Sequence, residues 1–270
     1  MTLGFYMVIK VAVSILMVVV LSWVAERAGP RIAGVISGYP LGAAISLFFI
    51  GLEQGADFAA RSAIFTAGGL AATLAFVAGY LLGLHRAEER GRAAALALAV
   101  LSAMATYGLT AWVLANIALG WLSAPAVALS AIVLADRAFR WVPEATIQQV
   151  AARRWVVTLC RAVFAAAVIL VITAAAGIVG PRWAGLFAAF PITMLPLLVI
   201  LQAAHQPSHV RTLIRNVPRG MVSLLVYTLT VAATYGRLGI VAGTLMGYLA
   251  ATVYLVGLET LRKRHLRRQL

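Results

Sequence analysis

Residues 29–40 read GPRIAGVISGYP, and residues 180–191 read GPRWAGLFAAFP, at a spacing of 151 positions. Both phrases begin with a Gly-Pro-Arg corner and end with an aromatic residue followed by proline. Glycine and proline are the strongest breakers of regular structure, yet both phrases lie in hydrophobic sequence. This repetition indicates an internal duplication in which each copy carries the same interruption.

The composition indicates the class of protein. Hydrophobic residues make up 63% of the chain and charged residues only 11%, against roughly 25% in an ordinary soluble domain. The mean hydropathy is +0.97. Since about 20 apolar residues cross a bilayer core, these values predict an all-α polytopic membrane protein. The uncharged runs cover 32–52, 62–84, 93–135, 162–181, 183–204 and 238–258.

The longest uncharged run, 93–135, has 43 residues, and as one helix it would extend about 65 Å, roughly twice the thickness of a bilayer core. We therefore divide it at a turn near 116–120. The chain then has nine predicted transmembrane helices. They lie at 3–26, 31–53, 60–84, 93–115, 119–137, 155–178, 182–204, 212–235 and 238–260.

The basic residues indicate how these helices are oriented. The net charge is +14, and with nine spans most of the 22 Lys and Arg residues fall on one side of the membrane. Because cytoplasmic loops collect Lys and Arg, the N-terminus is predicted outside and the C-terminus in the cytoplasm. This placement accounts for the positive charge without nucleic-acid binding.

Residues around the repeated phrase extend the duplication. Lys10 precedes Gly29 by 19 residues, and Arg161 precedes Gly180 by the same interval. The sequence predicts a first four-helix repeat at 1–115, a linker helix and cytoplasmic loop at 116–152, and a second four-helix repeat with a basic C-terminal tail at 153–270. A single linker helix turns the second unit upside down, which gives the inverted-topology repeats of many secondary transporters. Chance similarity within a low-complexity hydrophobic chain is the alternative.

Three segments carry a family resemblance: VIKVAVSILMVVVL at 8–21, IAGVISGYP at 32–40 and GLEQGADFAARSAIFTAGG at 51–69. They resemble the GlpM-like bacterial inner-membrane proteins, short chains of about four spans. The resemblance covers most of residues 5–80 and recurs more faintly at 156–235. It implies two fused units in the bacterial inner membrane, with a link to exopolysaccharide production but no particular substrate.

The second proline of each phrase predicts a break inside a membrane helix. Pro40 follows Pro30 by ten residues, about 15 Å along a helix, which places it near the bilayer midplane. Pro40 cannot donate a hydrogen bond to the carbonyl of Ile36, and Pro191 cannot donate to that of Phe187. Each freed oxygen then needs a neighbouring helix, a water or a ligand. Paired breaks of this kind point to a transporter's binding site, whereas a structural kink is the alternative.

The predicted substrate-binding residues flank these two breaks. Two cations, if they face inward, would attract an anionic group, although long side chains near helix ends also reach back to the interface. Small residues at Gly34, Gly38 and Gly42, and at Gly185, Ala189 and Thr193, would let backbones approach closely. The predicted set is Lys10, Arg161, Ile36, Ser37, Tyr39, Pro40, Phe187, Phe190, Pro191 and Thr193.

Other chemistry is not visible in the sequence. None of the eight acidic residues lies near the middle of a predicted span, so no carboxylate proton relay is expected. Sodium coupling through hydroxyls stays open, with Thr106, Tyr107, Thr244 and Tyr248 as further polar candidates beside structural hydrogen bonding. The four histidines lack ligand partners at metal-site spacing, and no catalytic motif occurs. We therefore expect neither an enzyme nor a bound cofactor.

These observations predict a secondary transporter or exporter of a small, anionic solute that works by alternating access at the interface of two inverted repeats. One alternative is a flippase for a lipid or lipid-linked glycan precursor, which the resemblance and the stripe Arg211, Arg215 and Arg219 favour. Another is a non-enzymatic membrane partner in envelope polysaccharide assembly. The expected partners are membrane lipid and the solute, with no nucleic acid, and a homodimer is left open.

Overall fold

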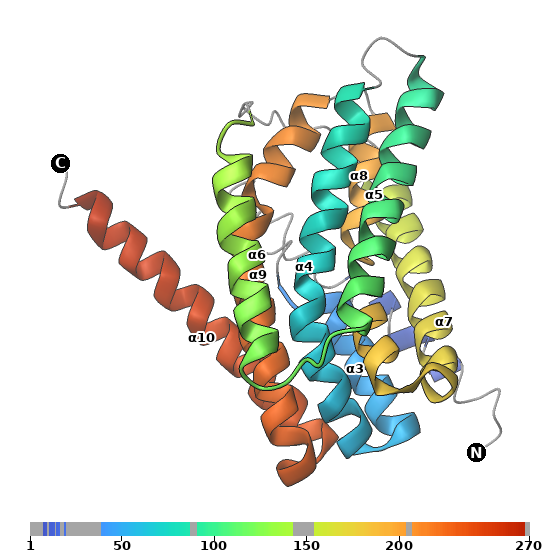
Figure 1. Cartoon of the computed structure of the whole chain (residues 1–270), viewed down its shortest axis with the longest axis vertical. Coiled ribbons are helices and arrows are strands. Elements are labelled where there is room, and N and C mark those ends of the chain that lie inside the picture. Colours follow the sequence, from blue (N-terminus) through green and yellow to red (C-terminus); the bar gives the residue numbers. More distant parts are fainter. Residues whose placement is uncertain are drawn as a thin grey trace.

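The computed structural model describes residues 8–9, 11–13, 15–16, 19, 39–86, 91–142, 154–203 and 207–267. These ranges form helices and connecting turns without any strand (Figure 1). The helices are α3 (Leu41–Gln54), α4 (Ala56–Arg86), α5 (Arg92–Ala115), α6 (Ser123–Phe139), α7 (Arg154–Ala188), α8 (Met194–Ala203), α9 (Pro207–Leu238) and α10 (Ile240–Arg267).

Five helical stretches within the described ranges are long and apolar enough to cross a membrane: Ala56–Arg86, Arg92–Ala115, Ala162–Ala188, Val210–Leu238 and Ile240–Leu258. Large apolar side chains such as Leu109, Val171 and Leu245 are exposed on the outer faces of these helices. This is the arrangement of a helical membrane protein, because lipid tails solvate such side chains. The predicted first span, 3–26, and the start of the second lie mostly outside the described residues.

Glycine and asparagine residues occur at the turns and bends between helical segments. The uncharged stretch 93–135 forms α5 and α6, and the turn between them begins at Asn116, whose side-chain amide donates to the carbonyl of Trp112 at 2.8 Å. Helix α7 is bent at Gly180, which has φ 77° and ψ 171°. Glycine adopts this conformation readily because it has no Cβ atom. The Gly-Pro-Arg phrase at 180–182 is therefore a corner, and its first copy lies outside the described residues.

The helix bounds recur at the spacing of the repeated phrase. Helix α4 begins at Ala56 and α9 begins 151 positions later at Pro207, and the short helices α3 and α8 precede them in the same order. The carboxylate of Asp57 lies beside Gly236, so the start of α4 meets the end of α9 and the two helices run antiparallel. In Figure 1, α3 occupies the lower half of the bundle and α8 the upper half.

Helices α4 and α9 pack together, and α6 covers both of them. Helix α5 packs along α4 and α10 along α9, with glycines at the contacts. A Cβ atom at Gly83 would overlap Ala99 of α5, and one at Gly247 would overlap the ring of Tyr227. Because apolar burial does not drive helices together within lipid, such close backbone approach supplies much of the packing energy.

Candidate functional site

The same tight turn interrupts the chain at both aromatic-proline pairs. The N–H of Leu41 donates to the carbonyl of Tyr39 at 2.7 Å, and the N–H of Ile192 donates to that of Phe190 at 2.7 Å. Pro40, at φ −74° and ψ 55°, has the central dihedrals of an inverse γ-turn. Proline suits this position because its φ is fixed and its missing N–H is not required.

After each turn the chain starts a short helix. The carbonyl of Pro40 accepts a hydrogen bond from Ala44 at 3.1 Å, and the carbonyl of Pro191 accepts one from Leu195 at 3.0 Å. The two interruptions also touch, since Gly42 packs against the side chain of Ile192. We call these turns, at 39–41 and 190–192, the first break and the second break.

Hydroxyl groups of α4 and α5 satisfy the second break. Thr66 Oγ1 donates to the carbonyl of Gly185 at 2.9 Å, and Thr73 Oγ1 donates to that of Ala189 at 2.6 Å. The hydroxyl of Tyr107 donates to the carbonyl of Leu186. The second break is therefore closed by side chains from neighbouring helices.

The carbonyl of Phe187 differs from the expectation. It accepts the N–H of Phe190 at 3.0 Å, because the last turn of this short helix tightens before the proline. The side chain of Phe187 is half-buried against Trp183, with ring centroids 5.6 Å apart. Neither its oxygen nor its ring is left free by the break.

Aromatic rings connect each break to the opposite half of the chain. The ring of Phe190 packs edge-on against Tyr107 at 5.1 Å and against Phe76 at 5.9 Å. The ring of Tyr39 stacks on Tyr248 of α10 at 5.7 Å, and Tyr248 lies 5.2 Å from Tyr227 of α9. The residue before each proline thus inserts among helices that follow the other break.

The hydroxyl groups around the first break come from different residues than those around the second break. The positions in α9 that match Thr66 and Thr73 of α4 at a spacing of 151 are Val217 and Leu224, which carry no hydroxyl. Hydroxyls come instead from the three tyrosines around this break. The hydroxyl of Tyr39 is 2.9 Å from Thr252 Oγ1.

Two of these tyrosine hydroxyls are unsatisfied. The hydroxyls of Tyr227 and Tyr248 are buried, and neither makes a hydrogen bond of good geometry with the described residues, although the hydroxyls of Tyr235 and Thr244 lie close to that of Tyr227. An unsatisfied buried polar group costs about 1–3 kcal/mol, and more in a membrane interior, where water is scarce. We call Tyr39, Tyr227 and Tyr248 the tyrosine cluster. Two of its hydroxyls could bond a further polar group, and the buried hydroxyls of Ser46 and Ser223 also have no partner among the described residues.

The predicted site residues divide into three groups. Tyr39 and Pro40 form the first break, whereas Phe190, Pro191 and the half-buried Thr193 lie at the second. The backbone of Arg161 lies in α7, but its side chain is outside the described part of the structure, as are Lys10, Ile36 and Ser37 entirely. The paired cations are thus a prediction from the sequence alone.

Tyr227 was not among the residues predicted from the sequence. The internal repeat could have identified it, because Tyr227 lies 151 residues after Phe76, the same interval that separates Tyr39 from Phe190. The other polar candidates make structural hydrogen bonds: Thr106 Oγ1 donates to the carbonyl of Ala75 at 2.9 Å, and Thr244 Oγ1 is 2.7 Å from the hydroxyl of Tyr235. Within the described ranges, no three His, Cys, Asp or Glu residues cluster as metal ligands.

The chain matches no protein-family model, no curated protein and no solved structure. The site itself therefore carries the functional argument. Its chemistry consists of neutral phenolic O–H groups, aromatic faces and a chain interruption shared by two antiparallel sets of helices. Phenolic O–H groups of this kind can donate hydrogen bonds to a small polar molecule.

Proposed function

We propose that the protein is a secondary transporter or exporter of a small, anionic solute. It works by alternating access between two inverted halves in the bacterial inner membrane, with the solute at the tyrosine cluster. The observation that carries the proposal is the pair of unsatisfied hydroxyls, Tyr227 and Tyr248, beside a break that recurs at 151 residues. Discontinuous helices that meet from opposite directions are the usual form of a transporter's binding site.

The hydroxyls favour an acceptor-rich solute. A phenol donates one hydrogen bond, and a hydrogen bond to a charged acceptor contributes about 1.5–3 kcal/mol, roughly twice a neutral one. Neutral donors also bind a carboxylate or phosphate group less tightly than a fixed positive charge would. This weaker hold favours release on the other side of the membrane. Lys10 and Arg161 would add attraction if they face this cluster.

The crosswise aromatic contacts support a movement in which both halves take part. Tyr39 packs on Tyr248 in α10, and Phe190 packs on Tyr107 in α5. Helix α3 contacts α10, and α8 contacts α5. A rocking movement of one half against the other would therefore change both sets of contacts together, as alternating access requires.

Removal of the two hydroxyls tests the proposal. Purified protein is first screened by thermal shift against small carboxylates and phosphate esters, and uptake of a stabilising anion into proteoliposomes is then measured. Tyr227→Phe and Tyr248→Phe should each weaken binding and uptake of that anion about tenfold, since each removes one hydrogen bond to a charged group. The thermal stability without anion should stay equal or rise, because an unsatisfied buried hydroxyl has been removed.

Tyr254→Phe is the matched control, because this tyrosine lies on the same helix as Tyr248 but outside the tyrosine cluster. It should leave binding and uptake unchanged. If both cluster variants bind and transport the anion as well as the native protein does, the proposal is wrong. Movement of a lipid-linked glycan precursor, the alternative favoured by the GlpM-like resemblance, then becomes the better hypothesis.

A further inference from the structure

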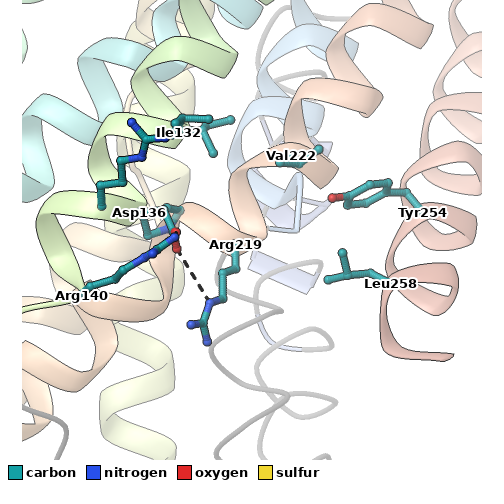
Figure 2. A pocket seen from close by; sticks show the side chains of 10 residues that line it. Ile132, Asp136, Arg140, Arg219, Val222, Tyr254 and Leu258 are labelled. Carbon is teal, nitrogen blue, oxygen red and sulfur yellow. Dashed lines mark hydrogen bonds and ion pairs between the residues drawn. The ribbon is translucent and has the colours of Figure 1, made fainter. Parts of the chain in front are cut away.

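A groove of about 870 Å³ lies between α6, α9 and α10, and no residue of either break lines it (Figure 2). Helix α10 diverges from the bundle along its C-terminal half (Figure 1), so the groove is open on its outer side. Its floor and walls are apolar and include Ile132 of α6, Val222 of α9, and Tyr254 and Leu258 of α10. In Figure 2, Tyr254 and Leu258 face Val222 and Arg219 across the groove.

The rim of the groove is basic. Its described lining contains three arginines, Arg137, Arg140 and Arg219, and a single carboxylate, Asp136. Arg140 Nη2 lies 2.9 Å from Asp136 Oδ2, and Arg219 Nε lies 4.0 Å from Asp136 Oδ1. One carboxylate therefore holds two guanidinium groups at the mouth of the groove, and positive charge remains in excess.

The guanidinium groups have capacity for a further ligand. The side chains of Arg140 and Arg219 are 65% and 48% exposed, whereas that of Asp136 is 30% exposed. A guanidinium has five N–H donors in a planar fork, and the contacts to Asp136 and to Asn216 Oδ1 use only some of them. The remaining donors suit the oxygens of a phosphate diester.

The arginines lie at one depth relative to the apolar segments. The uncharged sequence of α6 ends before Asp136, and that of α9 starts after Arg219, near the predicted cytoplasmic end of its longer stretch Val210–Leu238. The membrane-length stretch of α10 ends at Leu258. All three limits meet at this groove, which places its rim at the boundary between hydrocarbon and headgroups. A molecule in the groove would have its charged end among arginines and its apolar part along Val222 and Tyr254.

We propose that this groove binds an anionic phospholipid, with the phosphate between Arg137, Arg140 and Arg219 and an acyl chain along the apolar wall. The excess positive charge matches an anionic headgroup better than a zwitterionic one, and each basic residue near the surface adds about 1 kcal/mol of attraction. The bound lipid fills the space between α10 and the bundle and so holds the end of α10 in place. This inference is independent of the proposed transport.

Lipid retention tests the inference. Full-length protein in a neutral detergent is titrated with phosphatidylglycerol, with phosphatidylcholine of the same acyl chains, or with glycerol 3-phosphate, while bound lipid is counted by native mass spectrometry and unfolding is followed thermally. Phosphatidylglycerol should be retained and should raise the unfolding temperature. Phosphatidylcholine should do so at least tenfold more weakly, and glycerol 3-phosphate should have no effect at the same concentrations.

The double variant Arg140→Gln with Arg219→Gln should lose this preference, with at least tenfold weaker retention of phosphatidylglycerol. Arg86→Gln is the control, since Arg86 is an exposed arginine at the end of α4 and not part of the groove. Each variant is compared with its own lipid-free unfolding temperature, so a folding defect does not imitate a binding defect. Val222→Trp, which fills the apolar wall and leaves the arginines in place, should also lower retention.

Equal retention of phosphatidylglycerol and phosphatidylcholine would overturn the inference. So would a double variant that behaves like Arg86→Gln. An equal effect of glycerol 3-phosphate would assign the groove to a soluble phosphate compound instead of a lipid. None of these measurements uses transport, so they separate this inference from the proposed function.

Discussion

Gly42 and Ile192 lie against each other where the two breaks meet: a Cβ atom at position 42 would stand 3.3 Å from the Cβ of Ile192. Position 42 is therefore a point where α3 touches the turn of the second break. The contact joins two segments that are far apart in the sequence, and any relative movement of the two breaks must change it.

Gly42→Leu should destabilise the protein by about 1–3 kcal/mol, because a larger side chain forces a well-packed contact apart. If transport requires movement at this point, uptake of the stabilising anion should fall more than the loss of folded protein explains. Gly108→Leu is the control, since a Cβ atom at Gly108 meets nothing within 4 Å. Unfolding temperatures of the two variants that agree within error would contradict this packing.

Thr73→Val should lower stability by about 1 kcal/mol. The substitution keeps the shape of the side chain but removes the hydroxyl that donates to Ala189 at 2.6 Å, and interhelical hydrogen bonds in membranes average about 0.6 kcal/mol with a maximum near 1.7. Thermal unfolding in detergent measures the change. The control is Thr230→Val, whose hydroxyl bonds only within its own helix to Val226, and it should be nearly neutral.

A cross-link tests the antiparallel packing of α4 and α9. With the single cysteine Cys160 replaced by serine, Asp57→Cys and Gly236→Cys should form a disulfide under mild oxidation, because Asp57 lies beside Gly236. Mass spectrometry of the digested protein identifies the linked peptides. Asp57→Cys paired with Arg215→Cys, near the other end of α9, should give none, and the reverse result would refute the arrangement.

The two chain ends should lie on opposite sides of the membrane. The nine spans predicted from the sequence require this, and the basic residues, including the run 262–268, predict a cytoplasmic C-terminal end. A reporter active only outside the cytoplasm should work when fused to the N-terminus, and a cytoplasmic reporter should work at the C-terminus. If reporters at both ends were active in the same compartment, the inverted repeat would be refuted, and with it the shared position of the two breaks.

Much of the architecture was accessible from the sequence because membrane helices are specified locally. Charge-free length predicted apolar helices, five of which are long enough to cross a membrane within the described ranges. Gly180 predicted the corner, and the matched prolines predicted breaks at 40 and 191. The hydrogen bonds of the second break were less accessible. The free carbonyl was expected at Phe187, but the tightened turn uses that oxygen, and the oxygens of Leu186 and Ala189 accept hydroxyls from other helices.

By itself, the sequence determined the helical membrane class and the repeated interruption, since both follow from which residues can cross lipid and which cannot continue a helix. Only the tertiary structure decided that hydroxyls close the second break, that Tyr227 and Tyr248 remain unsatisfied beside the first, and that α6, α9 and α10 enclose a basic groove. The physical reason is that satisfaction of a buried polar group depends on which distant side chains pack beside it, and helix packing sets that choice.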